Sequence, residues 1–112
     1  MVIQIFGTKK CADSRKAERF FKERRIQTQF IDLKEKGISP GELRSICQSV
    51  SPEELIDTEG KEYEKRGFKY MKFDIIEELL DDPLLCKTPI VRLKGKATVG
   101  YQPDVWKTWI AD

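Results

Sequence analysis

The 112-residue sequence contains no histidine, and this absence excludes several kinds of active site. Without imidazole, Ser-His-Asp or Cys-His catalysis, a histidine general acid and a histidine metal ligand are all ruled out. The chain has only three cysteines, Cys11, Cys47 and Cys86, which are widely spaced and odd in number. That pattern fits neither a disulfide scaffold nor a Cys-x-x-Cys zinc site. We therefore expect no bound metal, and a nucleophile here must be activated by a dipole, a cation or a hydroxyl.

The sequence also lacks a long apolar run and a large excess of charge of either sign. No stretch approaches the length of a transmembrane helix, and the first residues lack the basic start and apolar centre of a signal peptide. Lys and Arg number 21 against 19 Asp and Glu, so the net charge of +2 gives no electrostatic argument for nucleic acid or an anionic membrane. We expect a cytoplasmic protein without a direct nucleic-acid or membrane partner.

The remaining pattern predicts one α/β domain over residues 1–112. Hydrophobic residues make up 39% of the chain, enough for a single core without disulfides. Strand patterns over 2–6 and 27–33 flank a helical pattern over 13–24, which predicts a right-handed parallel βαβ unit. The last third of the chain predicts two strands, over 89–93 and 97–100, joined by a tight turn at 94–96. A final helix is predicted over 103–110.

The middle of the chain, about residues 39–82, predicts short helices and no strand. Ser39-Pro40 and Ser51-Pro52 both carry N-cap and first-turn proline signals for helices. The predicted helices cover 39–50, a short segment from 51, 58–67 and 72–81. The element order is therefore βαβ, helical block, ββα. A sheet that joins a parallel pair to an antiparallel hairpin predicts a thioredoxin-like fold, with a four-stranded mixed sheet and an inserted helical block.

Cys11 is the cysteine whose surroundings predict reactivity. It stands between the first strand and the first helix, where unpaired backbone N–H groups and the positive end of the helix dipole favour a thiolate. Lys10 and Arg15 add positive charge nearby, and Ser14 carries a hydroxyl that can donate to the sulfur. A cysteine chosen for packing belongs in an apolar run, and Cys11 is not in one. We predict that Cys11 is the nucleophile and that Ser14, Lys10 and Arg15 stabilise its thiolate.

Several short motifs occur along the chain, and their order and spacing are fairly specific. They are Phe6-Gly7-Thr8-Lys9-Lys10-Cys11, Ser14-Arg15-Lys16-Ala17, the Ile26 to Asp32 strand, Glu54-Leu55-Ile56, Gly60-Lys61-Glu62-Tyr63, Asp82-Pro83-Leu84-Leu85, Thr88-Pro89-Ile90-Val91, Gly95-Lys96 and Val99-Gly100-Tyr101. Together they cover essentially the whole chain. In this order they resemble the arsenate reductase/Spx family (ArsC-type), whose members have a glutaredoxin-like core with a helical insertion.

The resemblance implies roles for two places in the chain. Cys11 matches the family's nucleophilic cysteine, and Pro89 matches the cis-proline that faces this cysteine in thioredoxin-like proteins. Thr88 and Pro89 are then expected to dock the backbone of a peptide or of glutathione beside the sulfur. Cys86 lies three residues before Pro89, so it is a candidate resolving cysteine, although its apolar neighbours also indicate a buried segment. Cys47 lies on an apolar helical face, and packing explains it better.

The chain departs from the family pattern at the arginines that hold an oxyanion. The position before the proline is Thr88, and the position after the final hairpin falls at Tyr101-Gln102. A third arginine lies in the helical block, where Arg44 or Gln48 takes its place. Guanidinium groups are the usual partners of such anions, so the replacement of two of these arginines by neutral groups weakens the case for arsenate.

The Spx-type Cys-x-x-Cys is also absent, because the fourth position is Ser14. The remaining redox route uses one thiol: Cys11 attacks a disulfide, and an external thiol resolves the product. We expect a monomeric thiol oxidoreductase-like protein with no bound cofactor that uses glutathione or a thiol protein as its partner. The alternatives are an Spx-like regulator that binds RNA polymerase or another protein, and a glutathione- or glutaredoxin-dependent arsenate reductase.

Overall fold

A four-stranded mixed sheet organises the computed structural model, which describes residues 2–67 and 72–110. The strand order is β2-β1-β3-β4. Strand β1 pairs in parallel with β2 and antiparallel with β3, and β3 pairs antiparallel with β4. The strands are β1 (Ile3–Gly7), β2 (Thr28–Asp32), β3 (Ile90–Leu93) and β4 (Lys96–Val99). The predicted parallel βαβ unit and the C-terminal hairpin are both confirmed.

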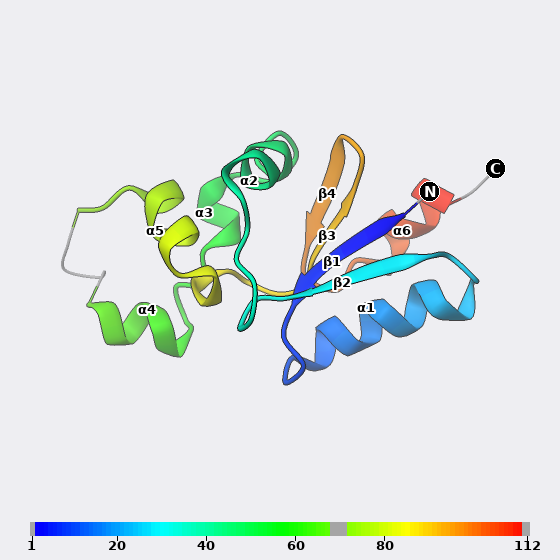
Figure 1. Ribbon diagram of the computed structural model, residues 1–112, viewed down its shortest axis with the longest axis horizontal. Helices are drawn as coiled ribbons and strands as arrows, with labels where there is room; N and C mark the ends of the chain where they lie inside the picture. Colours follow the sequence, from blue (N-terminus) through cyan, green and yellow to red (C-terminus); the bar gives the residue numbers. More distant parts are fainter. Residues whose placement is uncertain (1, 68–71, 111–112) are drawn as a thin grey trace.

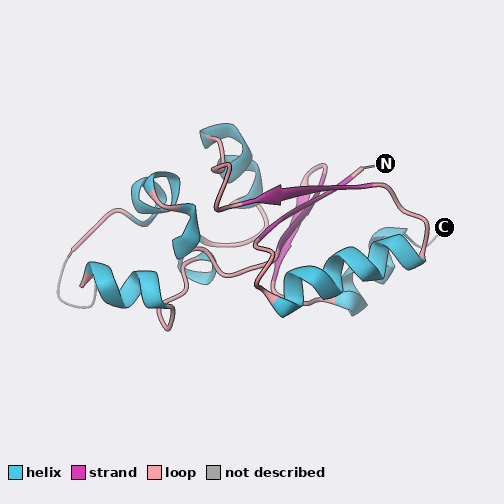
Figure 2. Cartoon of the chain, turned by 60° about the horizontal axis from the view of Figure 1, so that its bottom comes forward, coloured by secondary structure: helices cyan, strands magenta, loops and turns pink. Residues whose placement is uncertain are grey.

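One face of the sheet is covered by the first and last helices, α1 (Ala12–Glu23) and α6 (Pro103–Ile110) (Figures 1 and 2). Alternate strand residues point to this side, because successive side chains in a strand face opposite ways. Ile3, Ile5 and Val91 are fully buried here. They pack against Phe21 of α1 and Trp106 of α6, which are fully buried as well.

The other face meets the helical block, which lies between β2 and β3 in the chain. Its elements are α2 (Pro40–Ile46), α3 (Pro52–Leu55), α4 (Lys61–Arg66), α5 (Ile75–Asp81) and the 3₁₀ helix η2 (Pro83–Leu85). Phe6 and Ile90 from the sheet join Leu43, Leu55 and Leu79 from the block in a second buried cluster. Helices α4 and α5 extend past the strand ends, which makes the molecule long, at 47 × 27 × 23 Å (Figure 1).

Capping residues set several helix ends where the sequence predicts them. Ser39 and Glu42 form a reciprocal capping box, with backbone-to-side-chain hydrogen bonds of 3.0 and 3.1 Å. The Ser51 hydroxyl accepts from the N–H of Glu54, and Gly67 closes α4 at a φ of +68°. These residues form hydrogen bonds with unpaired backbone groups a few positions away, so the helix ends that they set can be predicted from the local sequence alone.

Three predicted helix bounds in the block need correction. Helix α4 is predicted from about Thr58 but begins at Lys61, after its N-cap Gly60. The sequence predicts that helix α2 runs to Val50, but it ends at Ile46, because i to i−3 hydrogen bonds tighten the chain after Cys47. Helix α5 is predicted from Lys72 but begins at Ile75, since the Asp74 carboxylate caps the N–H of Glu77. The 3₁₀ helix η2 has no counterpart in the prediction. In the part of the chain that the structure describes, no helix is long and apolar enough to cross a membrane.

Candidate active site around Cys11

Cys11 is the N-cap residue of α1, directly after the turn that follows β1. Its backbone N–H donates to the Thr8 carbonyl at 3.2 Å, and its carbonyl accepts from the N–H of Arg15 at 3.2 Å. The backbone of Cys11 is extended, with φ −80° and ψ 115°, so the helix begins at the next residue. The side chain is half-buried. The sulfur therefore lies at the N-terminal end of α1, where free N–H groups favour an anion.

Thr88 reaches the same sulfur from the loop before β3. Its hydroxyl donates to Cys11 Sγ at 3.0 Å, and the Cys11 thiol donates to the Thr88 carbonyl at 3.7 Å. The Thr88–Pro89 peptide bond is cis, as the family resemblance implies, and Pro89 is buried. The predicted docking residues and the predicted nucleophile are thus brought together from positions 77 residues apart. The hydroxyl contact itself was not predicted.

Ser14 lies beneath Cys11 on the first turn of α1. It is fully buried, and its Oγ makes no hydrogen bond of ordinary geometry with a described residue. It packs directly on Gly7, the last residue of β1, so closely that a side-chain carbon at position 7 would collide with the Ser14 hydroxyl. The Ser14 hydroxyl can rotate, and it has no acceptor among the described residues. The thiolate of Cys11 would be an acceptor for this buried O–H donor.

The pKa of the Cys11 thiol is lowered from its ordinary value. Burial raises this pKa, but the hydroxyls of Ser14 and Thr88 and the backbone groups of Ser14 and Asp13 together lower it by more. Thr88 is the residue whose side-chain hydrogen bond to the sulfur has ordinary geometry, whereas the Ser14 hydroxyl makes no such bond with a described residue. Donors aimed at the sulfur therefore favour the thiolate, which is the nucleophilic form.

Lys10 and Arg15, the predicted cationic partners of the sulfur, are both exposed. The Arg15 guanidinium donates to the Lys9 carbonyl at 3.0 Å, which commits one of its N–H groups to the preceding turn. Neither cation is among the groups that lower the pKa of Cys11. In this structure the thiolate is favoured by hydroxyl and backbone donors, and the role predicted for the two cations stays a prediction.

A cavity of about 470 Å³ opens beside the sulfur. Its lining residues come from the N-cap of α1, the helical block, the loop before β3 and the end of β4, and they are Cys11, Asp57, Cys86, Lys87, Thr88, Val99 and Gly100. Asp57, Val99 and Gly100 had no place in the sequence-based site. Asp57 lies in a loop of the helical block, and nothing in the local sequence indicates that it lines the same cavity as Cys11 and Thr88.

The other two thiols have pKa values raised from the ordinary value. Burial first, and then the charges of Asp82 and Cys47, raise the pKa of Cys86 to about 12. Cys86 is 5% exposed, although it lines the same cavity as Cys11. Burial and the nearby Glu53 raise the pKa of Cys47. Of the three cysteines, only Cys11 combines a lowered pKa with a position at the mouth of the cavity.

The two residues that are candidates for the place of the family's third arginine, Arg44 and Gln48, lie away from the sulfur. Arg44 and Gln48 line a separate groove with Cys47, between α2 and α5. Among the described residues that line the Cys11 cavity, Lys87 is the one cation and Asp57 the one carboxylate. An arsenate anion would meet no guanidinium among these described lining residues, and it would meet the negative charge of Asp57.

A mixed sheet of this order, with a thiol at the start of α1 and a cis-proline opposite it, defines a thioredoxin-like fold. A sequence model of the ArsC family matches residues 6–109. The chain belongs to the ArsC family. A comparison with curated proteins finds no match.

Three solved structures illustrate the likeness. The YffB protein is 26% identical, with a TM-score of 0.84 over 97% of this chain and 99% of that one. An arsenate reductase from Vibrio cholerae is 22% identical, with a TM-score of 0.80 over 94% of each chain. A glutaredoxin from Archaeoglobus fulgidus is 13% identical, with a TM-score of 0.50 over 98% of this chain and 86% of that one. The last two show the shared fold.

Proposed function

We propose that this ArsC-family chain is a thiol–disulfide oxidoreductase that works with one thiol, Cys11. The observation that carries the proposal is the 3.0 Å hydrogen bond from the Thr88 hydroxyl to Cys11 Sγ at an open cavity. A hydroxyl donor stabilises a thiolate, and a half-buried thiolate beside a cavity can be reached by a substrate sulfur. The partner would be glutathione or a protein thiol.

The proposed reaction has two balanced steps. The Cys11 thiolate attacks one sulfur of a disulfide such as glutathione disulfide, forms the mixed disulfide Cys11–S–S–G, and releases the other half as a thiolate. A second thiol then attacks the glutathione sulfur, which restores the Cys11 thiolate and yields a new disulfide. Ser14 is not a thiol, so this scheme needs the external reductant in the second step.

Mass spectrometry after brief treatment with glutathione disulfide tests this scheme. We expect one glutathione on Cys11, removed completely by excess free thiol, and no adduct on Cys47 or Cys86, because their thiols have raised pKa values. A chain that takes up no glutathione on Cys11 contradicts the proposal. A Cys11–Cys86 disulfide would replace the external second step with an internal one.

Arsenate reduction is a second candidate, favoured by membership of the ArsC family. The lining of the Cys11 cavity argues against it, because Lys87 is accompanied there by Asp57 and by no guanidinium among the described residues. We therefore rank it second. Glutathione-dependent turnover of arsenate at low substrate concentration would reverse this order.

A further inference from the structure

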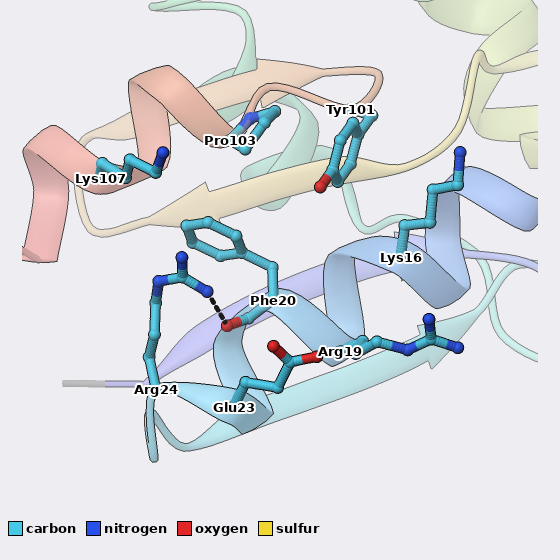
Figure 3. Close-up of a pocket in the computed structure, with 8 residues that line it drawn as sticks. All are labelled: Lys16, Arg19, Phe20, Glu23, Arg24, Tyr101, Pro103 and Lys107. Carbon is cyan, nitrogen blue, oxygen red and sulfur yellow. Dashed lines mark hydrogen bonds between the residues drawn. The ribbon is translucent and has the colours of Figure 1, made fainter.

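A second groove lies between α1 and α6, apart from the Cys11 cavity (Figure 3). Its volume is about 430 Å³. Helix α1 forms one wall, and the segment from Tyr101 into α6 forms the other. The described residues that line it include four cations, Lys16, Arg19, Arg24 and Lys107, and two residues with aromatic rings, Phe20 and Tyr101.

The lining of this groove is basic, although the chain as a whole is almost neutral. Of the described residues that line it, four are cations and one, Glu23, is an anion, whereas the full sequence has 21 basic and 19 acidic residues. Lys16 and Lys107 each have an acid three residues earlier, at 3.9 and 4.0 Å. Such exposed pairs hold their charges weakly, so both lysines can turn to another anion.

Two aromatic rings that line the groove, those of Phe20 and Tyr101, both pack on the ring of Trp106. Phe20 is 6% exposed, and its ring meets that of the fully buried Trp106 at 5.4 Å between centroids. The Tyr101 ring, which is more exposed, meets Trp106 at 5.6 Å. The Arg24 guanidinium lies 3.8 Å from the Phe20 centroid and donates to the Phe20 carbonyl at 3.0 Å (Figure 3). Tyr101, which is 41% exposed, is therefore the ring that offers apolar surface beside the cations, while Phe20 and Trp106 hold it from below.

The spacing of the cations indicates the shape of the occupant. Lys16 and Arg24 are eight residues apart on α1, which corresponds to about 12 Å along the helix axis. Figure 3 shows Lys16 and Tyr101 at one end of the groove and Lys107 and Arg24 at the other. A compact phosphate needs donors that converge on one point. A row of this length matches about four residues of extended peptide.

Each wall of the groove is close in the chain to a residue that lines the Cys11 cavity. Helix α1 begins directly after Cys11, so Lys16 follows the sulfur-bearing residue by about 7 Å of helix rise. At the other wall, Tyr101 follows Gly100, which lines the Cys11 cavity. A chain bound along the groove would therefore lie next to the site of exchange.

We propose that this groove docks an acidic segment of the protein whose disulfide Cys11 attacks. The segment is extended, about four residues long by the spacing of the cations, and carries an apolar side chain between its carboxylates. This role rests on the proposed function, because docking beside Cys11 serves exchange only if the sulfur reacts. Opposite charges chiefly raise the association rate and select the partner, so the effect falls as salt rises.

Binding of a peptide without cysteine tests the groove separately from the chemistry. The probe is a blocked pentapeptide with two glutamates on each side of one leucine, titrated into the full chain and followed by NMR. Its matched control has glutamines in place of the glutamates. The groove variant is Arg19→Glu with Lys107→Glu, and Arg19→Gln with Lys107→Gln serves if that variant does not fold. The matched variant, Lys61→Glu with Lys94→Glu, makes the same charge change outside the groove.

We expect the acidic peptide to shift signals of α1 and α6, and the groove variant to weaken its binding about tenfold at low salt. The matched variant should stay within about twofold of the original chain. Equal binding by the two double variants, equal binding of the glutamine peptide, or displacement by an equal concentration of inorganic phosphate would overturn the docking proposal. Exchange with glutathione disulfide, measured on the same samples, reports on the proposed function alone, since that small substrate does not need the groove.

Discussion

The Cys11→Ser variant is expected to lose thiol–disulfide exchange by at least about 10³-fold, the scale on which an enzyme loses activity with its nucleophile. A serine hydroxyl ionises far above neutral pH, so the donors from Thr88 and the start of α1 no longer produce an anion. The fold should be kept, because Cys11 is half-buried and a serine oxygen can still accept from Thr88. Reduction of a small disulfide by added glutathione, followed spectroscopically, measures the loss.

Two variants control this experiment. Cys47→Ser removes a half-buried thiol outside the cavity and should leave the exchange rate unchanged. Thr88→Val keeps the nucleophile but removes one hydroxyl donor, so we expect exchange at neutral pH to slow several-fold while the rate at high pH is largely kept. A Cys11→Ser chain that retains more than a tenth of the activity would show that another group carries the reaction.

The same variant separates the oxidoreductase from a regulator. An Spx-like chain that binds RNA polymerase or another protein would act through a surface, and Cys11→Ser leaves every described surface outside the cavity mouth unchanged. Partner binding that survives in Cys11→Ser, together with no measurable exchange by the original chain, would favour the regulator.

The Trp106→Ala variant is expected to lose about 3–5 kcal/mol of unfolding free energy, the usual cost of emptying a large aromatic site in a core. Trp106 is the fully buried residue of α6, and its indole N–H donates to the Thr98 hydroxyl of β4 at 2.8 Å. Its ring also meets those of Phe20 and Phe21 at 5.4 and 5.3 Å. Removing it would loosen α1, α6 and the edge of the sheet together.

Trp109→Ala is the matched control, because Trp109 lies on the same helix but is only partly buried. It should cost about 1–2 kcal/mol, within the range of ordinary substitutions. Urea unfolding followed by far-UV circular dichroism measures both variants without relying on the tryptophan signal. Equal losses for the two would contradict the central place given to Trp106 in the packing of α1 and α6.

Local patterns in the sequence were enough to predict the sheet and most helix starts. Ile3 and Ile5 alternate with Gln4, and the structure buries the first two while Gln4 remains partly exposed. Ser39 and Ser51 cap the helices that they were predicted to cap. These features follow from side-chain period and local hydrogen bonds, both of which are readable over a few residues.

The parts of the site that depend on distant residues were harder to predict. The position of Cys11 at a strand–helix junction was readable, but the hydroxyl contact from Thr88 joins residues 77 positions apart. Asp57 enters the cavity only because the helical block folds back to the end of the sheet. Side-chain direction was also unpredictable from proximity in sequence, since Arg15 turns to the Lys9 carbonyl.

The central claim is that one sulfur is held as an accessible thiolate, and the pH dependence of alkylation tests it most directly. Iodoacetamide labelling of the folded chain, resolved by peptide mass spectrometry, reports on all three cysteines at once. Because the pKa of Cys11 is lowered, the midpoint of its labelling rate against pH should lie below that of free cysteine in the same buffer. Cys47 should have a midpoint above that of free cysteine, and Cys86 should stay unlabelled while the chain is folded. A Cys11 midpoint at or above that of free cysteine, or faster labelling of Cys47 at neutral pH, would contradict the account.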